Sequence, residues 1–182
     1  LNYTFSSDME RQGKKRPLLF HRWGGLGNHR YQIGFSGDTY ITWESLSYLP
    51  YFTATASNVG YGYWSHDIGG HMGGEPTSEL YLRWLQYGIF SPILRTHSTK
   101  SAEIDRRIWK HNDFFNMMKN AIHLRYALVP YIYTAARKAY DTGISICRPL
   151  YYDYPDVDNA YEFRNQYMFG DDMLLAPVTE KV

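Results

Sequence analysis

The sequence contains a single cysteine, Cys147, so it can form neither an internal disulfide nor a metal site built from several thiolates. We expect Cys147 to be a small buried apolar side chain. Positive and negative side chains nearly balance, with a formal net charge of +1 at pH 7. Because no basic cluster occurs beyond residues 14–16, the sequence lacks the charge surplus of a nucleic-acid-binding protein, and we expect no nucleic-acid partner.

Long apolar runs are also missing. The longest fall far short of the roughly 20 residues that span a bilayer, and residues 1–3 begin no signal peptide, so we expect no membrane partner. The sequence has no G-x-S-x-G elbow and no HExxH motif. In GGLGNHR, residues 24–30, Arg30 stands where the third glycine of a dinucleotide fingerprint would be, which predicts an irregular loop.

Aromatic side chains, in contrast, are abundant and make up 18% of the sequence. A ring with a polar tip suits a surface that stacks on a sugar, because a sugar has an apolar face and a hydroxylated rim. A large core also absorbs aromatic rings, and 44% hydrophobic residues are enough to build one. Trp64 is expected to belong to the core rather than to a sugar platform.

Short apolar stretches alternate with longer amphipathic ones, which is the pattern of parallel strands joined by helices. It predicts strands over residues 17–23, 31–36, 58–65 and 89–97, and helices over 43–57, 77–87 and 103–140. Pro50 should kink or split the first helix, and Pro130 should break the last one at Val129. Beyond residue 143 strand-like runs separated by turn residues take over, so we place a domain boundary there.

Polar residues end each predicted strand. They are His21 and Arg22, Ser36 to Asp38, Ser65 to Asp67, and Arg95 to His97. The stretch GFSGDT, residues 34–39, could be a simple turn, since glycine and aspartate are turn formers. In a parallel barrel, however, the carboxyl ends of the strands line one mouth, where catalytic groups sit. The four clusters together therefore predict an active site.

Two aspartates, an arginine and histidines among aromatic rings fit the carboxylate chemistry of glycoside hydrolysis. A metal hydrolase is the alternative, with His21, His66, Asp67, His71 and His97 as possible ligands. It is less favoured because the sequence lacks the usual metal-ligand spacings. We expect no metal and no cofactor.

Four blocks of sequence, in this order along the chain, resemble the family-31 glycoside hydrolases, which include α-glucosidases and α-xylosidases. The blocks are HRWGGLGNHRYQIGFSGDT, YWSHDIGGH, ELYLRWLQYGIFSPILRTHS and YMFGDDMLLAPV. The resemblance implies an α/β fold: residues 1–143 as the C-terminal half of a (β/α)8 TIM barrel, and residues 144–182 as the start of an all-β C-terminal domain. It also implies a retaining enzyme. We predict an α-glucosidase acting on an oligosaccharide or other α-glycoside, with an α-xylosidase or a non-catalytic carbohydrate-binding relative as alternatives.

By resemblance, Asp38 is the general acid/base, and Arg22, Asp67 and His97 contact the sugar. Phe35 replaces a residue that is usually tryptophan in the family, and His71 replaces one that is commonly phenylalanine, so both could alter the sugar pocket. The family's nucleophile motif, W-x-D-M-N-E, is absent, and we expect it upstream of residue 1. The chain alone should therefore be inactive, and its open strand edges should require the missing barrel half or self-association.

Overall fold

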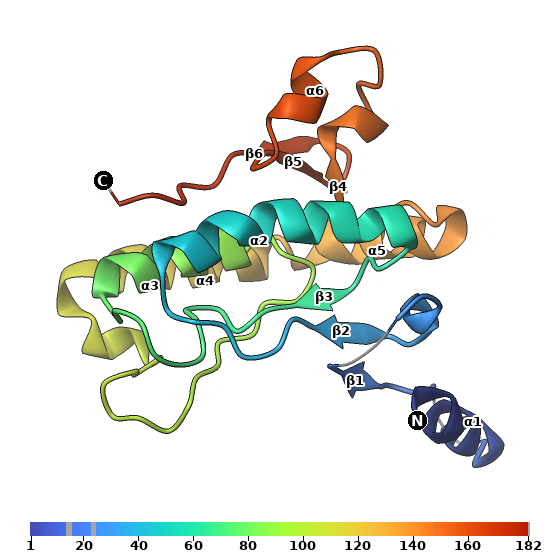
Figure 1. Ribbon diagram of the computed structural model, residues 1–182, viewed down its shortest axis with the longest axis horizontal. Coiled ribbons are helices and arrows are strands. Elements are labelled where there is room, and N and C mark those ends of the chain that lie inside the picture. Colours follow the sequence, from blue (N-terminus) through green and yellow to red (C-terminus); the bar gives the residue numbers. More distant parts are fainter. Residues whose placement is uncertain (14–15, 23–24, 182) are drawn as a thin grey trace.

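The computed structural model describes residues 1–13, 16–22 and 25–181, in which a layer of helices lies between two small sheets (Figure 1). The first sheet is parallel, in the order β1 (Phe20–His21), β2 (Ile33–Phe35), β3 (Trp64–Ser65). The helical layer holds α2 (Trp43–Thr55), α3 (Ser78–Gly88), α4 (Phe115–Ala127) and α5 (Val129–Thr142). The second sheet is antiparallel and comprises β4 (Cys147–Pro149), β5 (Tyr167–Phe169) and β6 (Met173–Leu175).

Smaller elements complete the described chain. They are the helix α1 (Asn2–Arg11), the short helix α6 (Asn159–Glu162), and the 3-10 turns η1 (Asn28–Arg30), η2 (Ala56–Val59), η3 (Ile108–Lys110), η4 (Asn112–Phe114) and η5 (Leu150–Tyr152). The sequence analysis did not predict α1, which buries only Ser6 and lies beside β1, away from the helical layer (Figure 1). No helix in the described part of the chain is long and apolar enough to cross a membrane.

The predicted parallel strands are present but shorter than expected. Trp23, at the end of the first predicted strand, and Gly24, in the loop after it, lie outside the described residues. Residues 58 and 59 belong to η2 rather than to a strand. The fourth strand consists of two isolated parallel bridges, Ser65 to Ile93 and Ile68 to Thr96, because Pro92 has no N–H to donate to a continuous ladder.

Side-chain caps fix where two helices of the central layer begin. The Thr42 hydroxyl accepts a hydrogen bond from Ser45 N at 3.1 Å, and the Thr77 hydroxyl accepts one from Leu80 N at 3.3 Å, so these two threonines are the N-caps of α2 and α3. Of the two effects expected of Pro50, a kink or a split, the split does not occur, since α2 runs through it. Pro50 is buried in α2, so packing against the core compensates for the backbone hydrogen bond that proline cannot make.

The last predicted helix begins later than its apolar spacing suggested. Residues 103–114 form loops and the turns η3 and η4. The His111 ring bonds to the Ser78 hydroxyl and to the Asp105 carbonyl, both at 2.8 Å, and these tertiary contacts hold the segment out of a helix. The break expected near Pro130 is confirmed, because α4 ends at Ala127 and α5 begins at Val129.

One hydrophobic core joins the helices to the antiparallel sheet. Trp84 and Leu85 of α3 are fully buried and belong to the same cluster as Phe169 of β5. Cys147 is 1% exposed, as expected, and burial raises the pKa of its thiol. On the other side β1 ends the parallel sheet, and Phe20 is half-exposed there. Association through this edge remains a prediction.

Gly34 is the tightest packing point of the parallel sheet. A Cβ atom there would lie 2.4 Å from the Trp64 ring and 2.6 Å from the Tyr61 ring. We therefore expect Gly34→Ala to lower the free energy of unfolding by about 1–3 kcal/mol, the usual cost of overpacking. Gly25→Ala is the matched control, because nothing lies within 4 Å of a Cβ at Gly25. Equal denaturant midpoints for the two variants would contradict this packing.

Candidate active site

Asp38 lies where the parallel strands end, in reach of two basic side chains. Its Oδ2 is 3.6 Å from Arg22 Nη1, and its Oδ1 is 3.7 Å from His71 Nε2. The Asp38 side chain is 33% exposed, so a ligand can reach it. Gly37 makes this arrangement possible: its φ is +88°, and a Cβ there would lie 2.8 Å from Arg22 Nε. The turn in GFSGDT thus brings Arg22 to the Asp38 carboxylate.

Asp67, by contrast, is held in the interior just after β3. Its side chain is fully buried, and Oδ1 accepts a short hydrogen bond from Arg95 Nη2. Its other oxygen, Oδ2, lies 3.1 Å from His71 Nδ1. The His71 imidazole therefore stands between the two aspartates, with its ring centroid 5.1 Å from that of His97.

Phe35 forms an aromatic surface beside these charged groups. The Arg95 guanidinium lies 4.5 Å from the centre of its ring, and that of Arg22 lies at 5.8 Å. Both are within the range of cation–π attraction. The structure thus brings together all six residues that the sequence analysis selected, namely Arg22, Phe35, Asp38, Asp67, His71 and His97. It adds Arg95, whose signal in the sequence was its place in the polar cluster that ends the fourth predicted strand.

The loop from Asp67 to His71 is fixed by an arginine that sequence reasoning did not select. Arg106 Nη2 donates to the Gly69 and Gly70 carbonyl oxygens at 2.5 and 2.7 Å. Both glycines have positive φ, and a Cβ at Gly69 would lie 2.6 Å from the Arg106 guanidinium. Only glycine fits this bend comfortably, which sets the position of His71 relative to Asp67. No sequence motif marks Arg106, because the hydrogen-bond acceptors that it binds are main-chain carbonyl oxygens.

A buried chain of hydrogen bonds ties the site to the helices. His66 Nδ1 lies 3.0 Å from the Ser36 hydroxyl, and Nε2 lies 2.7 Å from the Thr53 hydroxyl on α2. Thr53 in turn lies 2.6 Å from the Tyr87 hydroxyl on α3. Burial, with a smaller effect from the charge of Arg95, lowers the pKa of His66 from 6.5 to about 3. His66 is therefore a neutral, internal link between β2 and the helical layer.

The five residues considered as metal ligands do not all lie together in the structure. His66 is occupied inside the buried chain, and His21 hydrogen-bonds to the Tyr61 hydroxyl at 3.1 Å. The other three, Asp67, His71 and His97, each offer a ligand atom, and these atoms all lie within 4.8 Å of one another. The donors that could hold a metal are thus the same groups that surround Asp38.

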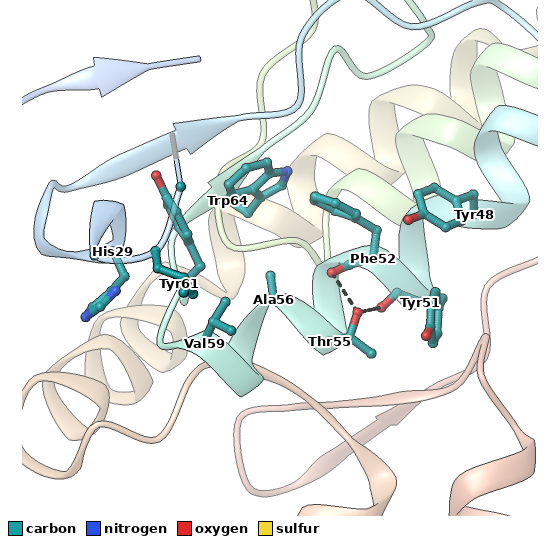
Figure 2. Close-up of a pocket in the computed structure, with 12 residues that line it drawn as sticks. His29, Tyr48, Tyr51, Phe52, Thr55, Ala56, Val59, Tyr61 and Trp64 are labelled. Atoms are coloured by element: carbon teal, nitrogen blue, oxygen red, sulfur yellow. Dashed lines mark hydrogen bonds between the residues drawn. The ribbon is translucent and has the colours of Figure 1, made fainter. Parts of the chain in front are cut away.

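A hollow lies between the β1–β2 connection and α2 (Figure 2). It has a volume of about 660 Å³ and is lined by aromatic rings, among them Tyr48, Tyr51, Phe52, Tyr61 and Trp64. We call it the aromatic cavity. Trp64 is only partly buried and lines it, so its expected place in the core is corrected. Among the described residues that line this cavity there is no carboxylate, so the pair of carboxylates that glycoside hydrolysis uses is not found there.

Comparison with known protein families gives two adjoining matches. Residues 2–135 match the model described as "Glycosyl hydrolases family 31 TIM-barrel domain", and residues 143–182 match "Glycosyl hydrolase family 31 C-terminal domain". This agrees with a barrel portion of parallel strands and helices followed by the start of a β domain.

Individual relatives agree with the family match. An alpha-xylosidase of Saccharolobus solfataricus is 36% identical over 93% of this chain and 24% of the relative. Neutral alpha-glucosidase C of Homo sapiens is 32% identical over 93% of this chain and 18% of the relative. The chain thus spans at most about a quarter of the length of these curated relatives.

Solved structures give the same result. A GH31 alpha-xylosidase from a soil metagenome, complexed with xylose, superposes with a TM-score of 0.87 at 33% identity, covering 98% of this chain and 30% of that one. A Flavobacterium johnsoniae GH31 dextranase complexed with glucose reaches 0.90 at 30% identity, covering 99% and 23%.

The neutral state of His66 predicts a pH-dependent stability. Between pH 6.5 and about 3 the unfolded chain binds a proton on His66 that the folded chain does not. The free energy of unfolding should therefore fall as the pH falls through this window, by up to about 1.4 kcal/mol per pH unit from this group.

The His66→Gln variant cannot titrate at this position. Its free energy of unfolding, measured with denaturant from pH 7.5 to 4.5, should therefore change less steeply with pH. His123→Gln, at an exposed position of α4, is the control and should keep the slope of the unsubstituted chain. The same slope for His66→Gln would show that His66 is not neutral in the fold.

Proposed function

Because this chain belongs to glycosyl hydrolase family 31, we propose that it supplies the acid/base side of the active site of a retaining α-glycoside hydrolase. The observation that carries the proposal is the place of Asp38. It is a partly exposed carboxylate at the carboxyl ends of parallel strands, within 4 Å of both Arg22 and His71. In a barrel, this is the end at which catalytic groups gather.

Asp38 would act twice in a double displacement. As an acid it protonates the departing glycosidic oxygen while a second carboxylate attacks the anomeric carbon. As a base it then takes a proton from the water that cleaves the covalent intermediate. The W-x-D-M-N-E motif is absent from this sequence, so the attacking carboxylate must come from a different segment of the enzyme.

The groups around Asp38 would hold the sugar before bond cleavage. Arg22 and His97 present hydrogen-bond donors at the exposed rim, and Phe35 presents a ring face beside them. Asp67 offers an oxygen, Oδ2, that accepts no hydrogen bond from the described residues, and a sugar hydroxyl could donate to it. His71 adds an imidazole between the two carboxylates.

We place the boundary between the barrel portion and the C-terminal β domain between residues 143 and 144. Gly143 supports it, because this residue caps α5 with a φ of +79°. The first strand of the antiparallel sheet begins four residues later, at Cys147. Residues 1–143 would thus carry the chemistry.

Replacement of the proton donor should affect substrates unequally. In the enzyme that joins this chain to a nucleophile-bearing segment, Asp38→Asn should lower kcat/KM for a poorly departing alcohol by about 10²–10⁴-fold. The loss should be much smaller for a dinitrophenyl glycoside, whose leaving group needs little protonation. Glu162→Gln, at an exposed position of α6, should leave both rates unchanged. Equal losses on the two substrates would exclude Asp38 as the acid, and full activity of Asp38→Asn would favour a carbohydrate-binding role for these residues.

The proposed substrate carries a terminal α-linked glucose. The human relative is a neutral alpha-glucosidase, whereas the Saccharolobus relative is an alpha-xylosidase, so a xyloside is the second candidate. On matched nitrophenyl α-glucoside and α-xyloside we expect the higher kcat/KM with the glucoside. A preference for the xyloside would replace the first assignment with the second while leaving the role of Asp38 intact.

A further inference from the structure

Asp67, His71 and His97 form a compact group of three metal-ligating side chains, which we call the His/Asp cluster. Asp67 follows β3, His71 lies at the end of the glycine loop after it, and His97 follows the bridge at Thr96. One ligand atom from each lies within 4.8 Å of the other two. Three separate segments thus present donor atoms to one point.

Two atoms of this cluster are buried without a hydrogen bond among the described residues. They are Asp67 Oδ2 and His71 Nδ1. The two lie 3.1 Å apart, but not in hydrogen-bonding geometry. The Asp67 side chain is 0% exposed, and its other oxygen is taken by Arg95. A buried carboxylate oxygen without a donor is costly, and such atoms often mark the place of an ion or a water.

We propose that the His/Asp cluster binds a divalent transition metal, with Zn²⁺ as the preferred ion. Two imidazole nitrogens and one carboxylate oxygen are the protein ligands of a known class of open zinc site. Imidazole also disfavours Mg²⁺ and Ca²⁺, which prefer oxygen ligands. Zinc bonds of about 2.0–2.2 Å place ligands on one ion within about 4 Å of each other. The cluster must therefore contract by less than about 1 Å, and the exposed ring of His97 can move that far.

Arg95 acts on this site in two ways. Its hydrogen bond to Asp67 Oδ1 fixes the orientation of the carboxylate and leaves Oδ2 available to a metal. Outer-shell partners of metal ligands act in this way. Its positive charge also repels a cation, and Asp38, whose Oδ1 is 3.7 Å from His71, offsets part of that repulsion. The affinity should therefore lie below that of a closed four-ligand zinc site.

His71 is the residue on which the cluster depends most directly, because its imidazole lies between the Asp67 and Asp38 carboxylates. A phenyl ring of similar size cannot ligate a metal. The metal proposal does not depend on the proposed function, since binding of Zn²⁺ alone tests it. If both hold, zinc and the sugar would compete for Asp67 and His97.

The test is isothermal titration of ZnCl₂ into the enzyme that contains this chain and into its His71→Phe variant, with circular dichroism to compare their folds. We expect one zinc per chain and at least about a tenfold weaker Kd for His71→Phe. His97→Gln, at an exposed position, should also weaken binding, and it decides the matter if His71→Phe does not fold. His123→Phe removes a histidine outside the cluster and should bind zinc like the unsubstituted chain. Absence of one-site binding, or unchanged affinity in both cluster variants, would overturn the proposal.

Discussion

Parallel pairing of β1, β2 and β3 is the constraint on which the site depends. Since parallel strands all end at one edge of a sheet, the residues that follow them meet there, although they are far apart in sequence. In this register Gly34 of β2 pairs with His21 of β1 on one side and with Trp64 of β3 on the other. Gly34 can sit between them only because it has no side chain. A shift of one residue in this register would move Asp38 away from Asp67.

Buried polar contacts then hold the loops beyond the strands. His66 joins the residues after β2 and β3 to α2 through two hydrogen bonds, and Arg106 holds the glycine loop by its carbonyl groups. Arg22 pairs with Asp38 and Arg95 with Asp67, so each aspartate has an arginine beside it. These contacts fix the charged side chains relative to one another, and such preorganisation is what the proposed acid–base role of Asp38 would require.

The alternating fold and the meeting of Asp38 with Asp67 could be predicted from sequence, because polar residues directly follow apolar strands. Other features could not. Arg106 binds main-chain oxygens and leaves no motif, and His111 keeps residues 103–114 out of the helix that their spacing favours. Trp64 lines the aromatic cavity because only the short turn η1 forms in the described part of the β1–β2 connection, which leaves space between that connection and α2.

The central claim is that sugar binding and catalysis occur at the carboxyl ends of the parallel strands. A crystal structure of the enzyme containing this chain, with a bound monosaccharide, tests it most directly. The account predicts a sugar ring whose hydroxyl groups contact Asp67 and His97, with Asp38 facing the anomeric oxygen. A sugar seated only in the aromatic cavity, against Tyr51 and Trp64, would contradict it.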